Sequence, residues 1–144
     1  MSLRAIPTLV FSFLLYNAIV LAMGVGAPGT ENTPASGLWG EIFSVNLLSG
    51  GHWVFTWGDL ILLVTLMLLF IEIVKATFTS TSTLIDHALS MIVFVAILVE
   101  FLMAPQAATS VFFLVLVASL IDVIAGYTIG IRVARRDLAI GADQ

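Results

Sequence analysis

Long apolar stretches alternate with short polar segments along this chain of 144 residues. Four of the stretches reach or approach the roughly 20 residues that a helix needs to cross a hydrocarbon core of about 30 Å. Turn-forming residues separate them, at Pro28, in the Ser/Thr run 79–83 and at Pro105. We therefore predict a single all-α domain over residues 1–144, an integral membrane four-helix transmembrane bundle. The expected spans are 5–25, 57–78, 84–103 and 109–132.

The first connection, residues 26–56, is the only sizeable segment outside the expected spans. It begins polar and becomes apolar over residues 38–48, with Glu41 and other polar residues interspersed. This mixture favours a short helix lying in the outer membrane interface and ended by Gly50. We expect the connection to cover the end of the bundle, with a dedicated binding surface as the alternative.

The first stretch also has the outline of a secretory signal peptide, because Arg4 precedes an apolar run that ends in small residues. The most suitable cleavage site follows Ala27, and Pro28 would come directly after it, where proline is a poor fit. We therefore expect the first stretch to remain in the protein as a membrane span.

Composition agrees with a lipid environment. The chain is 60% hydrophobic and only 10% charged, whereas a typical soluble domain is about half apolar and roughly a quarter charged. The net charge is -4, and the basic residues lie at segment ends instead of forming a stripe, which argues against a nucleic-acid partner. The absence of cysteine excludes thiolate metal sites and thiol redox chemistry.

The basic residues predict the orientation. If the chain crosses the membrane four times, all of them fall on one side, and the positive-inside rule places that side and both termini in the cytoplasm. We expect the bacterial inner (cytoplasmic) membrane as the location. The tryptophans fall on the outer side, where amphipathic rings favour the interface. The expected interfacial anchors are Trp39, Trp53 and Trp57 outside and Arg132, Arg135 and Arg136 inside, and the remaining basic residues are Arg4 and Lys75.

Asp122 is the strongest candidate for a functional residue, because an ionisable group deep in a membrane costs several kcal/mol unless it is paired or hydrated. It precedes Arg132 by ten residues, which places it about 15 Å inside the cytoplasmic boundary. Small residues surround it at helical spacing, and Gly126 and Gly130 form a GxxxG pattern. We expect a helix of this chain or of another subunit to pack against Ala118, Gly126 and Gly130.

Asn17 lies at a similar expected depth and is the predicted partner of Asp122. The pair could act as a protonatable relay or ion site, or it could be an interhelical hydrogen bond that fixes packing, worth about 0.6 kcal/mol on average. Glu100, Asp122 and Glu72 lie at outer, middle and inner depths. These three acids would form a proton or ion relay if all of them faced one cavity.

Glu72 and Lys75 lie three residues apart, so they can pair along the surface of the second span. Gly58, Thr65, Glu72 and Thr79 recur at heptad spacing, and we expect this polar stripe to face protein. In the alternative, Lys75 reaches the headgroups and neutralises Glu72 there. His87 is expected to be an ordinary polar residue at the membrane boundary.

Enzyme signatures are missing from the sequence. It contains no nucleotide-binding glycine loop, no HExxH and no Gly-x-Ser-x-Gly pattern. His52 and His87 fall on opposite sides of the membrane in the expected topology and cannot share a metal or a haem. We therefore expect a protein that is not an enzyme and holds neither a metal nor a cofactor.

Two function classes remain open. The first is an accessory or structural subunit whose partners are the lipid bilayer and either other membrane subunits or copies of itself. The second is a small oligomeric proton- or cation-coupled transporter or channel that uses Asp122. A membrane enzyme acting on lipid or quinone is less favoured, and its candidate residues are Glu72, Lys75, Asp86 and His87.

Overall fold

The structure, a computed structural model, describes residues 6–77 and 83–141, with side chains over 6–77 and 87–132. Within these ranges the fold is mostly helical, with one small antiparallel sheet. The helices are α1 (Leu9–Met23), α2 (Trp57–Ala76), α3 (Thr83–Met103) and α4 (Ser110–Gly141), and the sheet pairs β1 (Glu41–Asn46) with β2 (His52–Thr56). Two short 3₁₀ turns, η2 (Gly37–Trp39) and η3 (Pro105–Ala107), complete the connections.

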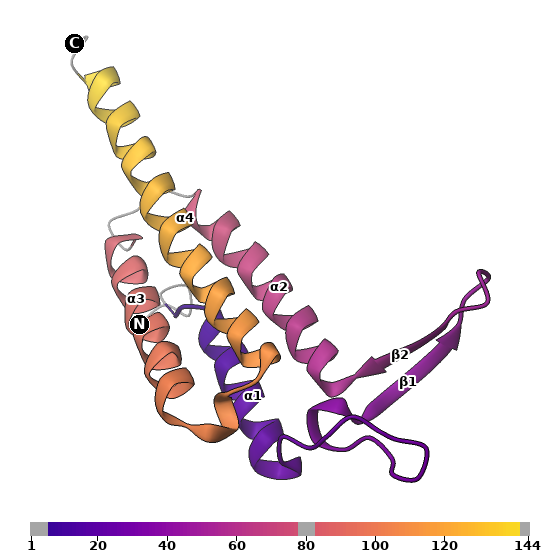
Figure 1. The fold of residues 1–144 in the computed structure, drawn as a ribbon. Helices are drawn as coiled ribbons and strands as arrows, with labels where there is room; N and C mark the ends of the chain where they lie inside the picture. Colours follow the sequence, from indigo (N-terminus) through magenta and orange to yellow (C-terminus); the bar gives the residue numbers. More distant parts are fainter. Residues whose placement is uncertain (1–5, 78–82, 142–144) are drawn as a thin grey trace.

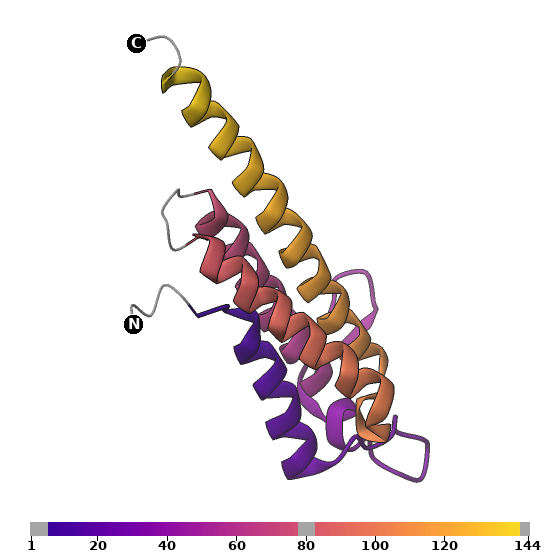
Figure 2. The same ribbon diagram turned by 90° about the vertical axis from the view of Figure 1, so that its left-hand side faces the viewer.

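The helices run side by side and alternate in direction, so the end of α1, the start of α2 and the start of α4 lie at one end of the bundle (Figure 1). Helix α4 packs against both α2 and α3, and α1 packs mainly against α2. Beyond Arg132, where the predicted span ends, α4 continues as a helix to Gly141. This last part projects past the other helices (Figures 1 and 2).

Two helices are long and apolar enough to cross a membrane, namely α2 over Trp57–Ala76 and α4 over Ser110–Arg132. Leu9–Met23 and His87–Met103 are shorter apolar helices. Four spanning helices and one short interfacial helix were predicted, and the described residues contain four α-helices. Helix α1 begins later than expected because Pro7 and Thr8 form its entry, with their carbonyl oxygens accepting from the N–H groups of Val10 and Phe11.

The predicted interfacial helix is wrong, and so is the purely α-helical class, because its segment forms the β1–β2 hairpin instead. β-branched and aromatic residues fill both strands, and these residue types favour a pleated surface. The turn is closed by Gly50, whose φ of 83° suits glycine. Its N–H donates to the carbonyl of Leu47 at 2.9 Å, and the Leu47 N–H donates to Gly51 at 2.8 Å, as in a short hairpin connection.

The first half of the 26–56 connection does cover the end of the bundle. Leu38 on η2 is 3% exposed and belongs to the apolar core. Its N–H donates to the Val25 carbonyl at 3.0 Å. Gly26 has a φ of 72°, and a Cβ there would lie 2.0 Å from the carbonyl oxygen of Ser36. Only glycine therefore allows these two backbone segments to cross so closely.

The apolar core is concentrated at this same end. Tyr16, Ile61, Phe112 and Val115 are fully buried, and the rings of Tyr16 and Phe112 meet edge to face at 4.6 Å. A smaller cluster of Leu9, Leu69 and Ala118 lies further along the bundle. Together these two clusters fix the packing of α1 against α2 and α4.

The distribution of polar and apolar side chains differs from that of a soluble protein. Large apolar side chains are exposed along every helix, whereas several polar side chains are buried between the helices. Soluble proteins rarely expose such extended apolar surface, and intramembrane polar groups typically face the bundle interior. The exposed set includes Phe11, Leu14, Leu66, Met67, Phe70, Ile92, Leu102, Phe113, Ile124 and Ile131, and the buried polar set includes Ser12, Thr65, Glu72, His87, Ser90, Ser119 and Asp122.

Candidate functional site

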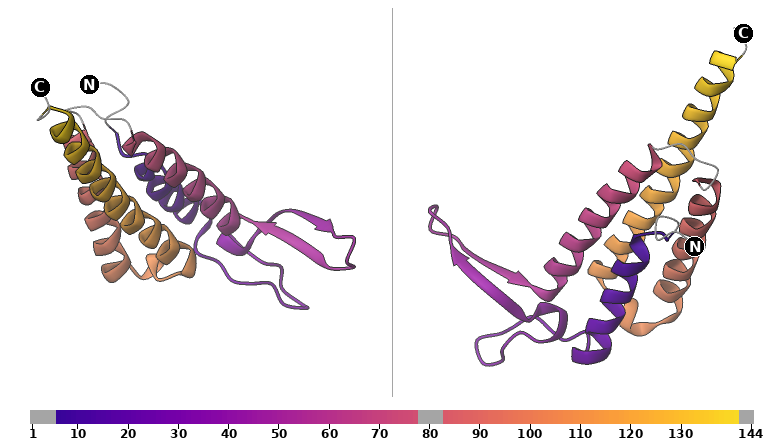
Figure 3. Two further views of the ribbon diagram at one scale, coloured as in Figure 1. Left: turned by 90° about the horizontal axis from the view of Figure 1, so that it is seen from above. Right: turned by 180° about the vertical axis from the view of Figure 1, so that it is seen from behind.

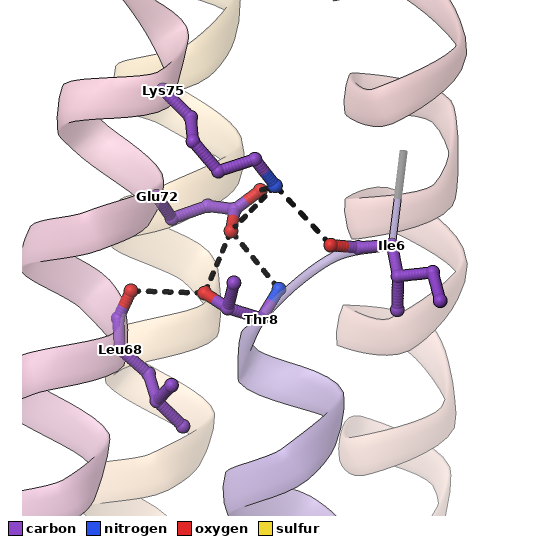
Figure 4. A network of polar contacts seen from close by, with 5 residues as sticks. All are labelled: Ile6, Thr8, Leu68, Glu72 and Lys75. Carbon is purple, nitrogen blue, oxygen red and sulfur yellow. Dashed lines mark hydrogen bonds and ion pairs between the residues drawn. The ribbon is translucent and has the colours of Figure 1, made fainter. Parts of the chain in front are cut away.

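The buried polar side chains form interhelical contacts at three levels of the bundle. Glu72 stands at the first level, where α2 meets the start of α1 (Figure 4). One of its carboxylate oxygens, Oε2, accepts from the Thr8 N–H at 2.9 Å and lies 2.7 Å from the Thr8 hydroxyl. Lys75 Nζ contacts both carboxylate oxygens, at 3.1 and 3.2 Å, and donates to the Ile6 carbonyl at 3.2 Å.

Glu72 therefore caps a helix other than its own. The first N–H groups of a helix lack intrahelical partners and carry partial positive charge. No side chain of α1 supplies a cap at Thr8, and the carboxylate of Glu72 takes that place. The predicted Glu72–Lys75 pair is present, and Lys75 also donates to the Ile6 carbonyl.

At the middle level the described part of the predicted polar stripe of α2 faces protein, since Gly58, Thr65 and Glu72 are all buried. Thr79, its fourth predicted member, lies outside the described residues. The hydroxyl of Thr65 donates to the Ile61 carbonyl at 2.7 Å and contacts the hydroxyl of Ser12 on α1. The Ser12–Thr65 contact joins α1 to α2 one helical turn from Thr8. This hydroxyl pair lies in a fully packed part of the interface, with Ser12 at 0% and Thr65 at 2% exposure.

At the outer level Asn17 contacts Glu100, not Asp122 as predicted. Its Nδ2 donates to Glu100 Oε2 at 3.3 Å and to the Phe13 carbonyl at 3.2 Å. The prediction counted depth from Arg4, but α1 ends at Met23, only about 9 Å beyond Asn17 at 1.5 Å per residue. Asn17 therefore lies near the level of Glu100, which is close to the end of α3.

Tyr16 adds a second polar link at the outer level. Its hydroxyl donates to the Gln106 carbonyl at 2.8 Å and lies 2.8 Å from the hydroxyl of Thr109. The Thr109 hydroxyl in turn accepts from the N–H of Phe112 at 3.1 Å, in the first turn of α4. Tyr16 thus ties α1 to the η3–α4 connection. The sequence did not identify Tyr16 as a candidate, although Thr8, Ser12 and Tyr16 recur every four residues.

Asp122 is 5% exposed, and the Ser90 side chain of α3 is its hydrogen-bonding neighbour. The charged groups of Glu72 and Lys75 lie close enough to act on it electrostatically. The three acids therefore divide into two groups: Glu72 and Asp122 are neighbours, whereas Glu100 is bound to Asn17 at the outer level. Each acid contacts a helix different from its own.

His87 is the residue that sequence reasoning placed least well. It is 8% exposed and fills the space above the two glycines of the GxxxG pattern. A Cβ on Gly126 would lie 2.5 Å from His87 Nδ1, and one on Gly130 would lie 3.5 Å from Nε2. The ring also lies 5.6 Å from that of Tyr127. The buried Nε2 has no hydrogen-bond partner among the described residues.

The small-residue positions of α4 are thus occupied within the chain. Gly126 and Gly130 receive His87 of α3, and Ala118 packs with Leu9 and Leu69. Of the two options left open by the sequence, a helix of the same chain or another subunit, the structure shows the first. The GxxxG spacing indicated close packing, but only the fold identifies the residue that enters it.

The expected anchors lie at the two ends of the bundle. Trp39 is 51% and Trp53 is 47% exposed, whereas Trp57 packs against the core. Arg132 is exposed where the apolar part of α4 ends. The side chains of Arg135, Arg136 and Asp86 lie outside the described ones.

Among the described side chains, those of residues 6–77 and 87–132, no three His, Asp or Glu converge as a metal site would require. Comparisons with protein-family models, with curated proteins and with solved structures found no match. The assignment of function therefore depends on the contacts described above. In the structure, these contacts join helices to one another through buried polar groups.

Replacement of Glu72 by alanine should lower the free energy of unfolding by about 2 kcal/mol, because charged hydrogen bonds to Thr8 and Lys75 are lost together. Glu72→Gln keeps an acceptor for Thr8 and should cost less. Thermal unfolding in detergent, followed by circular dichroism, measures both. The control is Thr77→Ala, which removes an exposed hydroxyl bonded only to the Val74 carbonyl. Equal stability of Glu72→Ala and this control would contradict the capping role.

Gly126→Ala and Gly130→Ala should have opposite effects. The methyl group at 126 collides with the His87 ring and should cost about 1 to 3 kcal/mol. At 130 the contact is ordinary, and alanine should gain up to about 1 kcal/mol in helix propensity. Adding His87→Ala should restore much of the stability lost in Gly126→Ala. The same unfolding assay measures all three, and equal effects at the two glycines would refute the placement of His87.

Proposed function

We propose that this chain is an integral membrane protein that crosses the bilayer four times, and that α1 and α3 span together with α2 and α4. The support is the inside-out distribution of polarity, since exposed Leu, Ile, Phe and Met side chains surround buried hydroxyls and acids. α1 is short for a full crossing at 15 residues. Packing against longer neighbours and local thinning of the bilayer accommodate such a helix at modest cost.

The proposed orientation has both termini in the cytoplasm of a bacterial inner membrane. The alternating helix directions bring the Lys75 end of α2 and the Arg132 region of α4 to the same end of the bundle (Figure 1). Basic residues favour the cytoplasmic side. The opposite end carries Trp39 and Trp53, which suit an outer interface.

For function we propose a non-enzymatic accessory or structural subunit, working within a larger membrane complex or as a homo-oligomer. The observation that carries this proposal is that three acids face neighbouring helices: Glu72 and the partly buried Glu100 hydrogen bond to the α1 segment, and Asp122 lies beside Ser90 of α3. Such bonds fix the packing of a membrane bundle. Large exposed apolar faces on α2, α3 and α4 leave room for neighbouring subunits.

A small proton- or cation-coupled transporter remains the alternative, favoured by one observation. Asp122 and Glu72 are both buried and lie within electrostatic range of one another and of Lys75. Intramembrane acids of this kind often mark ion pathways. In that function an oligomer would supply the rest of the path, because the polar groups of one chain are already engaged with each other.

The orientation can be tested directly, because the chain contains no cysteine. Asn32→Cys lies in the 26–56 connection and Gln144→Cys at the C-terminal end. A membrane-impermeant maleimide should label Asn32→Cys in intact spheroplasts and Gln144→Cys only after permeabilisation. The reverse pattern, or equal labelling of both sites in intact spheroplasts, would refute the orientation.

The subunit proposal predicts that gentle detergent extraction from the native membrane recovers the chain in an assembly of fixed stoichiometry, seen by native mass measurement. Asp122→Leu, which leaves Ser90 without its partner, should weaken the bundle by about 0.6 to 1.7 kcal/mol. Asp122→Asn retains an acceptor and should leave both assembly and stability nearly unchanged.

Purified protein in liposomes separates the two functions. A subunit without transport activity should give no proton or cation flux above that of empty liposomes, in the native form and in Asp122→Asn alike. A flux that Asp122→Asn abolishes, with assembly intact, would overturn the subunit proposal in favour of transport. Recovery as a monomer in every mild detergent would also count against it.

A further inference from the structure

The β1–β2 hairpin is amphipathic. Its register places Phe43 opposite Phe55 and Val45 opposite Trp53, so these four residues share one face of the sheet. On that face the rings of Phe43 and Phe55 stack at 4.8 Å, and Trp53 meets Phe43 edge on at 5.9 Å. We call this set the aromatic face.

The opposite face of the hairpin is more polar. Ser44 pairs with Val54, and Asn46 pairs with His52. A hydrogen bond of 2.8 Å joins the Asn46 side-chain oxygen to His52 Nδ1. The hairpin therefore has one side suited to water and one suited to an apolar surface.

The aromatic face is largely uncovered by the rest of the described chain. Phe43 is 45%, Val45 is 44% and Trp53 is 47% exposed, and Leu48 in the turn is fully exposed. The hairpin extends away from the helices in both views of Figure 3. An isolated two-stranded sheet is only marginally stable in water, and it needs a surface against its apolar face.

The position of the hairpin is set by α2. Strand β2 ends at Thr56, and α2 begins at the next residue. Thr56 and Asp59 form a capping box, with the Asp59 N–H donating to the Thr56 hydroxyl at 3.2 Å and the Thr56 N–H to Asp59 at 2.9 Å. Because no linker separates β2 from α2, the hairpin must lie at the depth of the N-terminal end of α2, where its apolar span begins.

The hairpin projects from the start of α2 on the side of this helix that faces away from the rest of the bundle (Figure 1). The apolar side chains of α2 that are exposed to the surroundings include Leu63, Leu66, Met67 and Phe70. If lipid surrounds these side chains, as the proposed membrane placement requires, the hairpin lies at the level of the headgroups of the same lipids.

We infer that the aromatic face of the hairpin, Phe43, Val45, Trp53 and Phe55, is a lipid-binding surface that lies on the outer leaflet beside α2. This inference rests on the proposed membrane placement. Aromatic side chains favour the headgroup region. The free backbone edges of a two-stranded sheet need water and cannot enter the hydrocarbon core, but they remain hydrated at the interface.

The lack of charged residues in this segment determines which kind of lipid headgroup it can bind. From residue 42 to residue 58 the sequence contains no Lys, Arg, Asp or Glu. Attraction to anionic headgroups requires clustered basic residues, which this segment lacks. The surface therefore binds through apolar contact with the headgroup and upper acyl region, and zwitterionic lipids suffice.

Tryptophan fluorescence in phosphatidylcholine vesicles tests the inference on the full chain, which has only three tryptophans. Trp39→Phe combined with Trp57→Phe leaves Trp53 as the single reporter. Lipids brominated in the upper acyl chain should quench most of its emission, and aqueous iodide should quench little. Val45→Asn, on the aromatic face opposite Trp53, should reduce the lipid quenching, whereas the matched Val54→Asn on the other face should not.

A second reporter tests the membrane placement separately. With all three native tryptophans changed to phenylalanine, Phe70→Trp places one indole on the exposed side of α2, where Phe70 is 65% exposed.

Quenching of Trp53 together with this reporter supports the inference. Quenching of the α2 reporter alone, with Trp53 open to iodide, overturns the lipid-binding face and leaves the membrane placement intact. Trp53 shielded from both quenchers would assign the face to a protein partner and also overturn the inference. If the brominated lipid quenches neither reporter, the proposed membrane placement is itself wrong.

Discussion

The polar groups of this bundle have to find their partners inside the protein, and α1 is where most of them do so. Thr8, Ser12 and Tyr16 recur every four residues on one face of the chain, and Asn17 follows directly. These residues reach Glu72 and Thr65 of α2, Thr109 at the start of α4 and Glu100 of α3. The shortest of the four described helices thus contacts the other three through hydrogen bonds. The N–H of Thr8, at its start, depends on a carboxylate supplied by α2, so Glu72 fixes how α1 begins against α2.

This pattern explains why buried acids need not indicate transport. An acid in an apolar environment requires donors, and here the backbone of Thr8, the amide of Asn17 and the hydroxyl of Ser90 provide them. Each contact also joins two helices, so one arrangement satisfies the acids and fixes the packing. Among the described side chains, Glu72 and Asp122 are two buried acids close enough to act on one another electrostatically.

The bundle and the hairpin meet the environment in different ways. The helices present broad apolar surfaces and keep their polar groups inside. The hairpin divides polar and apolar residues between its two faces, as suits a boundary between water and a less polar phase. Thr56 connects the two because it ends β2 and caps α2, so the positions of α2 and of the hairpin cannot change independently.

The sequence determined the features that depend on composition and on local helical geometry. The four long apolar segments that form helices, the burial of Gly58, Thr65 and Glu72, and the Glu72–Lys75 pair follow from the length of apolar runs and from neighbours on one helix surface. The tertiary structure decided which helices face one another. Asn17 contacts Glu100 instead of Asp122, and His87 fills the space over Gly126, because periodicity fixes neither the rotation of a helix nor its shift along a partner. The hairpin was missed because a short apolar run with few polar residues fits a strand as well as a helix, and only pairing with a second strand across Gly50 selects the strand.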